Sequence, residues 1–184
     1  MRDLYVRGRI IEVLPGGKAP KRATPFSVGF DVFAREDVTL YPFVPTKVPL
    51  GFRFTPGLIA NAAPWTDSWD VGVDVDDVLH INELVCEIRP RSSLALRGVE
   101  VVNAPGTIDP DFPGEFCAIL RYIPRQSPSP SYVRVDDYLV RSGDKVAQLV
   151  FPGSPLSPRL GCEEPDEGAT RTGGFGSTGG VKAL

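Results

Sequence analysis

The chain has 184 residues, enough for one domain with a hydrophobic core, and 42% of them are hydrophobic, an ordinary share for a globular protein. The net charge of −3 excludes a general basic surface for nucleic acid, and no stretch approaches the roughly 18 apolar residues of a membrane span. We therefore expect a cytoplasmic protein, in the host cytoplasm if the chain is viral, that binds neither nucleic acid nor membranes.

Short strands are the main elements that the sequence predicts. The 19 prolines and 19 glycines indicate many turns and leave little room for long helices. Runs rich in Val, Ile, Phe and Tyr predict strands within residues 4–14, 28–34, 47–54, 83–88, 98–102, 116–122 and 144–151. Short strands at this spacing are typical of a sandwich or a jelly roll, so we expect an all-β fold.

Two segments interrupt this series of strands. Residues 61–82 contain Trp65, Trp69 and five aspartates but no lysine or arginine, and we interpret them as an insert. Valines alternate with glycine and aspartate from residue 71 to 76, which favours a strand with one acidic face over a cation site. The aromatic residues of the insert could alternatively bind a protein partner. Residues 124–134, rich in Pro and Ser, predict an extended surface loop.

The cysteines and the single histidine limit the possible chemistry. Cys86, Cys117 and Cys162 lack the paired spacing of a zinc site or a disulfide framework, which favours reduced thiols. His80 is the sole histidine, so most schemes with a catalytic histidine and all multi-histidine metal sites are excluded. An enzyme with this sequence would use a carboxylate as its base.

Polar clusters lie within or beside the predicted strands. Asp31 lies in the strand at 28–34, and Gln148 lies in the strand at 144–151. Arg91, Ser92 and Ser93 lie where a strand gives way to residues that favour a helix. Asn103, Asp109 and Phe112 lie around a predicted hairpin followed by a turn at 103–113. Backbone N–H groups beside the two serines could meet an anion.

Each cluster also has a structural alternative. Asp31 could bond neighbouring backbone groups, Ser92 could be a helix N-cap, Asp109 could cap a turn and Gln148 could pair across the sheet. The last cluster, "RTGGFGSTGG" at residues 171–180, is either a flexible tail or a segment that closes over a phosphate and a flat ligand.

Taken in order, the segments "VGFDVFA", "PRSSLALRG", "NAPGTIDPDFPGEF", "GDKVAQLVF" and "RTGGFGSTG" resemble the five motifs of the trimeric deoxyuridine triphosphate nucleotidohydrolases, or dUTPases. The resemblance implies a jelly-roll-like β-barrel (β-clip) subunit and a homotrimer with shared active sites. It also implies conversion of dUTP to dUMP and diphosphate with Mg2+, which lowers dUTP and supplies dUMP for thymidylate synthesis. Residues 1–168 would form the β domain and residues 169–184 a C-terminal lid.

The resemblance also implies a role for each motif residue. Asp109 is implied as the catalytic base that deprotonates the attacking water, and Asp31 as the residue that holds Mg2+ through water. The remaining site residues bind substrate: Asn103, Gly106 and Ile108 at the uracil, Phe112 at the deoxyribose, Arg91, Ser92, Ser93 and Gln148 at the triphosphate, and Arg171, Phe175, Gly176, Ser177 and Thr178 from the lid, where Phe175 stacks on the base.

The sequence departs from the family pattern at two positions. Phe112 stands where the family usually has a tyrosine, so the ring can still exclude a 2′-hydroxyl by shape but cannot form a hydrogen bond through a phenol. Arg171 lies four positions before Phe175, one fewer than the usual spacing. The contact between Arg171 and the γ-phosphate is therefore the least secure of the implied roles.

Two other functions remain open at this point. The related dCTP deaminases share the trimeric fold and an "RSS" segment, but "GTIDPDF" and "GGFGSTG" in this chain favour hydrolysis. A regulatory protein of the same fold could bind a partner through residues 61–82, and this role is compatible with hydrolysis.

Overall fold

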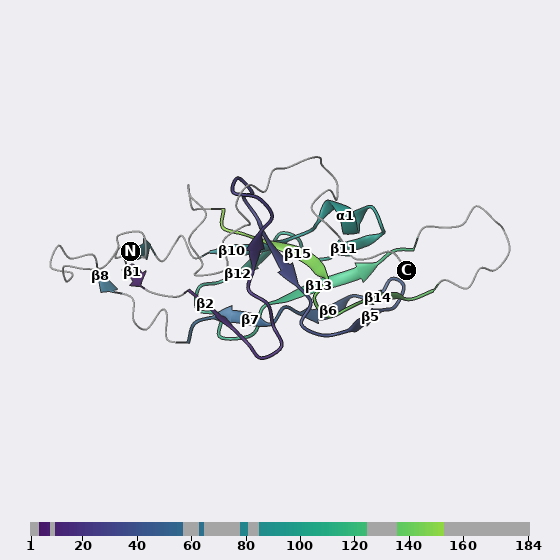
Figure 1. Ribbon diagram of the computed structural model, residues 1–184, viewed down its shortest axis with the longest axis horizontal. Helices are drawn as coiled ribbons and strands as arrows, with labels where there is room; N and C mark the ends of the chain where they lie inside the picture. Colours follow the sequence, from purple (N-terminus) through teal and green to yellow (C-terminus); the bar gives the residue numbers. More distant parts are fainter. Residues whose placement is uncertain are drawn as a thin grey trace.

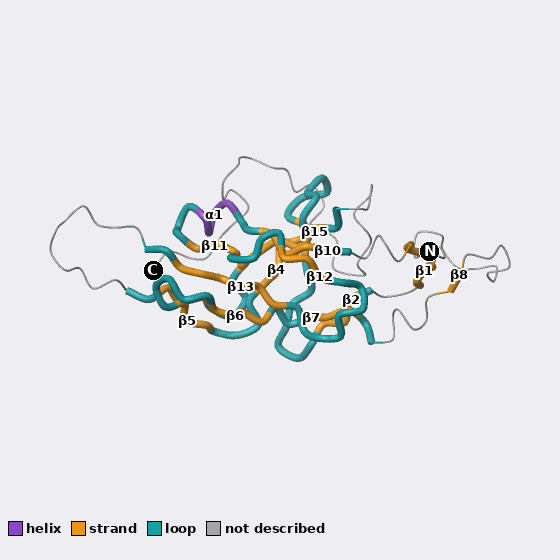
Figure 2. Tube along the Cα trace, turned by 180° about the vertical axis from the view of Figure 1, so that it is seen from behind, coloured by secondary structure: helices purple, strands orange, loops and turns teal. Residues whose placement is uncertain are grey.

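The computed structural model describes residues 4–7, 10–56, 63–64, 78–80, 85–124 and 136–152. This part of the chain folds almost entirely into short strands, and its one helix, α1 (Ser92–Ala95), lies beside β11 (Val99–Val101) (Figure 2). The all-β prediction is confirmed. No helix in this part is long and apolar enough to span a membrane.

The largest sheet has five antiparallel strands in the order β12-β10-β15-β4-β3 (Figure 1). The strands are β12 (Gly106–Ile108), β10 (Cys86–Arg89), β15 (Lys145–Val150), β4 (Phe30–Phe33) and β3 (Lys21–Arg22). Three of the predicted polar clusters therefore belong to one sheet. Asp31 lies in β4, Gln148 lies in β15 and Asp109 directly follows β12.

The remaining strands form four smaller antiparallel sheets rather than one closed barrel within the described residues. One sheet has the order β11-β13-β6 and includes β13 (Cys117–Tyr122) and β6 (Thr46–Pro49). Two sheets have two strands each: β14 (Tyr138–Val140) with β5 (Val38–Leu40), and β2 (Ile11–Val13) with β7 (Phe52–Phe54). The last sheet has the order β8-β1-β9 and consists of β8 (Ala63–Pro64), β1 (Leu4–Arg7) and β9 (Val78–His80). Figure 1 shows β1 and β8 at one end of the molecule, apart from the larger sheets.

The hydrophobic core is built from the inward-facing residues of these strands. In β13, for example, Ala118 and Leu120 are fully buried while Ile119 between them is exposed, as the period of two in a strand requires. Phe116 is fully buried at the centre, with its ring centroid 5.1 Å from that of Phe52 and 4.9 Å from that of Phe54.

All seven predicted strand segments contain strands. The run at 4–14 holds both β1 and β2, and the run at 47–54 covers the end of β6 and all of β7. The prediction missed β3, β5, β8, β9, β12 and β14, each of which has two or three residues and is too short to show an alternating pattern. Apart from 63–64 and 78–80, the insert at 61–82 lies outside the described residues, and so does the loop at 124–134 except for Pro124.

The strands that flank residues 103–113, β11 and β13, pair antiparallel as the two strands of a hairpin do. The predicted tight connection between them is wrong, because the chain between them also forms β12, which pairs with β10 in another sheet. The chain reverses in a tight turn in which the Ala104 N–H donates to the Val101 carbonyl. The predicted second turn is present, since the Phe112 N–H donates to the Asp109 carbonyl at 3.0 Å.

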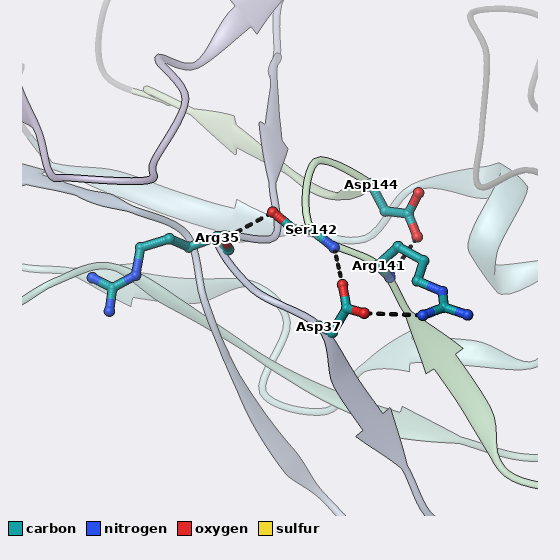
Figure 3. A network of polar contacts seen from close by, with 5 residues as sticks. All are labelled: Arg35, Asp37, Arg141, Ser142 and Asp144. Atoms are coloured by element: carbon teal, nitrogen blue, oxygen red, sulfur yellow. Dashed lines mark hydrogen bonds and ion pairs between the residues drawn. The ribbon is translucent and has the colours of Figure 1, made fainter.

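A polar network fixes the turn that leads into β15 (Figure 3). Asp37 accepts hydrogen bonds from the Ser142 N–H at 2.8 Å and from the Arg141 guanidinium at 3.0 Å, and these bonds lower the pKa of its carboxyl. Asp144 accepts from the Arg141 N–H, and the Ser142 hydroxyl donates to the Arg35 carbonyl. The network anchors the first residues of β15 to the segment between β4 and β5.

Candidate active site

A row of polar residues crosses the five-stranded sheet. Lys21 on β3 lies opposite Asp31 on β4, Asp31 lies opposite Gln148 on β15, and Gln148 lies opposite Arg89 on β10. Residues directly opposite one another in antiparallel strands project from the same face of the sheet. The fold thus brings Asp31 and Gln148 together with two cationic residues that the sequence analysis had not assigned.

Asp31 is the centre of a buried ion cluster. It is only 2% exposed, and its two carboxylate oxygens lie 3.0 Å from the Arg91 Nε and 3.0 Å from the Lys145 Nζ. The Arg91 side chain is 3% exposed and also donates to the Lys145 carbonyl at 3.3 Å, while the Lys145 side chain is 29% exposed. The alternative that Asp31 bonds neighbouring backbone groups is wrong, because its carboxylate faces cationic side chains.

The start of α1 positions Arg91 in this cluster. Arg91 is itself the N-cap residue, with extended backbone angles of φ −101° and ψ 133°, and Ser92 is the first helical residue, so the alternative of Ser92 as the N-cap was wrong. Ser92 is exposed. The Ser93 hydroxyl oxygen is buried and has no hydrogen-bond partner within the described part of the chain, which leaves it able to bond a ligand.

The segment around β12 carries a second group of predicted residues. Asn103, Asp109 and Phe112 are exposed, Gly106 is buried and Ile108 is half-buried. The turn from Asp109 to Phe112 holds the carboxylate and the aromatic ring on one short loop. An exposed carboxylate can act as a base toward a bound water.

The two groups lie far apart within one chain. Ile108 pairs with Cys86, three residues along β10 from Arg89, and three strand intervals separate β12 from β4. With about 3.4 Å per residue and about 4.8 Å per strand, the backbones of Ile108 and Asp31 are separated by about 18 Å. The two groups therefore form two separate parts of the candidate site.

The cationic residues are the part of the site that the sequence analysis missed. Lys145 lies in the motif "GDKVAQLVF", and its position at the start of the strand that carries Gln148 was the available signal. Arg89 forms an ion pair with Glu87 at 2.7 Å, so its charge is compensated locally. Arg91 and Lys145 contact one carboxylate and Lys21 lies opposite it in the sheet, and a group of cationic residues of this kind suits a polyanion.

The lid residues Arg171, Phe175, Gly176, Ser177 and Thr178 lie outside the described residues, as does Cys162. The other two cysteines are free thiols, and burial raises the pKa of Cys86.

The fold and the cation-rich site together define an all-β protein suited to a polyphosphate ligand. Solved structures with a similar fold include the dUTPase from Streptococcus mutans, with a TM-score of 0.51 and 20% identity over 77% of this chain and 93% of that chain. A mutant dUTPase from phage phi11 of S. aureus, whose structure describes the coordination of a structural Mg(II) ion, has a TM-score of 0.52 and 16% identity over 76% of this chain and 86% of that chain.

Sequence comparison identifies the family. The deoxyuridine 5'-triphosphate nucleotidohydrolase of Helicobacter pylori strain P12 is 32% identical over 176 residues, which cover 95% of this chain and 98% of that protein. The enzyme of the same name from Caulobacter vibrioides strain NA1000 is 42% identical over 94 residues, or 50% of this chain and 54% of that protein. No family model matches the chain. The chain belongs to the dUTPase family, and the predicted resemblance to that family is confirmed.

We predict that Asp31→Ala lowers the free energy of unfolding by about 3–5 kcal/mol, because it leaves the buried Arg91 guanidinium without its carboxylate. Urea denaturation at one fixed protein concentration measures the change. Asp37→Ala is the matched control, since its side chain is 53% exposed and the loss of such a surface pair costs little. Equal destabilisation in the two variants would show that the Asp31 cluster does not hold the fold.

Proposed function

We propose that this protein hydrolyses dUTP to dUMP and diphosphate by attack of water on the α-phosphorus. The observation that carries the proposal is the 32% identity to the Helicobacter pylori enzyme over 95% of the chain. The relatives and neighbours named above are all dUTPases, which also disfavours deamination of dCTP. Release of diphosphate from dUTP, with no ammonia released from dCTP, tests this reaction.

The cluster around Asp31 forms the triphosphate half of the proposed site. Arg91, Ser92, Ser93 and Gln148 bind the phosphates. Lys145 joins them, because it is the more exposed of the two cations that contact Asp31 and can turn toward a ligand. Charge-assisted hydrogen bonds to phosphate oxygens are strong where water is partly excluded.

The segment around β12 forms the nucleoside half. Asn103 and the main chain at Gly106 and Ile108 contact uracil, and the ring of Phe112 lies against the deoxyribose. The Asp109 carboxylate accepts a proton from the attacking water and so orients a lone pair of its oxygen toward the phosphorus. The exposed carboxylate supports this role.

Mg2+ fits this site only together with the substrate. Both carboxylate oxygens of Asp31 already face cationic nitrogens, and the described residues contain no cluster of three or more His, Cys, Asp or Glu residues that could hold a metal ion. Mg2+ keeps much of its hydration and binds substrate phosphates, so Asp31 would meet it through water. When bound, the ion neutralises part of the charge on the triphosphate.

A homotrimer with shared active sites explains the separation of the two halves. The separation of about 18 Å between Ile108 and Asp31 of one chain supports the proposal that the nucleoside half of one subunit meets the triphosphate half of another. The outer face of the sheet β11-β13-β6 also supports association. Val102 is 40% exposed and Ile119 is 38% exposed, and the Val102 N–H donates to the Ile119 carbonyl, so the two apolar side chains are neighbours.

The proposed organisation includes a lid and a possible partner surface, both carried over from the sequence. Residues 1–168 form the β domain and residues 169–184 the lid, which closes with Phe175 on the base. The insert at 61–82 is proposed to bind a protein partner, and phage dUTPases such as that of Staphylococcus bacteriophage 80alpha control transfer of virulence genes. Deletion of the insert followed by separate assays of turnover and partner capture tests this role. Two free cysteines support a cytoplasmic location.

Asp109→Asn should retain dUTP binding but lose turnover by about 10²–10⁴-fold or more, because an amide keeps the shape of the carboxylate and cannot accept a proton. Single-turnover kinetics and equilibrium binding of a non-hydrolysable dUTP analogue measure the two effects. Asp111→Asn, an exposed carboxylate on the same turn, is the control and should keep its activity. Near-normal turnover by Asp109→Asn would remove that residue from the mechanism.

Mixing two inactive variants tests the shared site. Asp109→Asn and Gln148→Ala each impair every site in a uniform trimer, but a mixed trimer regains one site with an intact nucleoside half and an intact triphosphate half. Co-refolding the two variants should therefore restore activity, with the trimer mass measured by light scattering. A mixture as inactive as its components, or a fully active species near 20 kDa, would mean that one chain forms a complete site.

Removal of the residues after Glu167 should leave the trimer folded, because no described strand is lost. It should lower kcat/KM by about 100-fold or more, because the phosphates stay exposed to water and closure over the base is lost. Circular dichroism and steady-state kinetics measure the two effects. An unchanged kcat/KM would identify the segment as a flexible tail.

A further inference from the structure

Three glycines in the described part of the chain lie directly beneath one substrate-binding side chain each. A Cβ atom on Gly114 would lie 2.8 Å from the Phe112 Cζ, one on Gly106 would lie 2.9 Å from the Asn103 Nδ2, and one on Gly29 would lie 3.2 Å from the Gln148 Oε1. We propose that these glycines are positioning residues that fix the ring and the two amides by leaving room for them. The proposal rests on the substrate roles assigned above.

Backbone conformation does not explain these glycines. Gly16, Gly51, Gly98 and Gly143 have positive φ angles, which glycine adopts without strain, but Gly29, Gly106 and Gly114 do not. Each of these three positions could therefore hold another residue as far as its backbone is concerned. What these positions require is the absence of a Cβ atom, because a substrate-binding side chain occupies the space beside it.

Gly114 and Phe116 together hold the ring of Phe112. The ring lies on the Gly114 backbone, and its centroid is 6.3 Å from that of Phe116, which packs against Phe52 and Phe54 in the core. Phe112 has no hydroxyl group that a hydrogen bond could anchor. Packing against the glycine and the buried aromatic rings therefore sets the plane of the ring that faces the sugar.

Gly106 holds the Asn103 amide in the same way. The Nδ2, Cγ and Oδ1 atoms of Asn103 would lie 2.9, 3.3 and 3.4 Å from a Cβ on Gly106, so the whole amide rests on the glycine. Gly106 is buried and paired with Ile88 in the sheet, which makes it a rigid support. No hydrogen bond holds the Asn103 side chain within the described residues. Its donor and acceptor remain available to a base while packing fixes their direction.

Gly29 holds Gln148 less tightly. The closest approach of a Cβ would be 3.2 Å to the amide oxygen and 3.4 Å to the side-chain carbons, which a small shift of the glutamine can relieve. The structure therefore predicts a graded series, with large effects at Gly114 and Gly106 and a smaller one at Gly29. Gly17 is a contrasting case, because its Cβ would collide with the Gly51 backbone and the effect would be on folding.

The experiment measures kcat/KM for dUTP, UTP and dCTP in full-length protein. Gly114→Ala should lower the preference for dUTP over UTP by about 10- to 100-fold with little change in the preference over dCTP, and Gly106→Ala should do the reverse. Gly29→Ala should change both preferences little and raise the KM for dUTP. Equal losses for all three nucleotides in both Gly114→Ala and Gly106→Ala would overturn the proposal, since a general structural defect acts in that way.

A double-mutant cycle separates positioning from folding. If Gly114 acts through Phe112, Gly114→Ala should lower Tm in the natural background but not in a Phe112→Ala background, where the ring that meets the new Cβ is absent. The Asn103→Ala and Gly106→Ala pair gives the second cycle. Additive losses of Tm would overturn the proposal even if the single variants fold poorly. If Phe112→Ala alone leaves the preference over UTP unchanged, the assigned sugar contact fails, and the Tm cycle still decides the role of Gly114.

Discussion

The buried ion cluster around Asp31 is the constraint on which the rest of the site depends. A carboxylate with 2% exposure is strongly unfavourable unless cations face it, and Arg91 and Lys145 do so from segments far apart in the sequence. Strand β4, the start of α1 and the start of β15 must therefore meet at one point. The same meeting places Gln148 opposite Asp31. The Asp37 network reinforces it, because it fixes the turn that delivers Lys145 to the cluster.

The two cations that contact Asp31 differ in their exposure. The Arg91 side chain is 3% exposed and compensates the Asp31 charge in addition to its proposed contact with phosphate, whereas the Lys145 side chain is 29% exposed and remains within reach of a ligand. A lysine ammonium is a compact charge on a flexible stem, so it can turn from the carboxylate to a phosphate without leaving Arg91 uncompensated. A polyphosphate would thus bind Lys145 while the buried pair of Asp31 and Arg91 stays intact.

The strand segments and the motif residues could be predicted from the sequence, but their pairing could not. The apolar runs that became β4, β13 and β15 have the length and composition of strands, so local pattern was sufficient there. The segment after β11 has the punctuation of a hairpin, yet β12 pairs with β10, a choice set by non-local sheet pairing. Lys145 was missed because a lysine next to a turn has no local signature of burial beside a carboxylate. The support of Phe112 by Gly114 is likewise visible only in three dimensions.

The separation of Asp109 from Asp31 links assembly to activity in the proposed trimer. In that trimer a lone subunit would carry a nucleoside half and a triphosphate half that belong to different sites, so it would have no complete site even when correctly folded. An association that buried Val102 and Ile119 would remove apolar area from water and so stabilise each shared site. Because subunit association depends on concentration, the fraction of complete sites would fall on dilution below the dissociation constant of the trimer. The glycine supports suit this arrangement, since substrate-binding side chains that are fixed before dUTP binds lose less conformational freedom on binding.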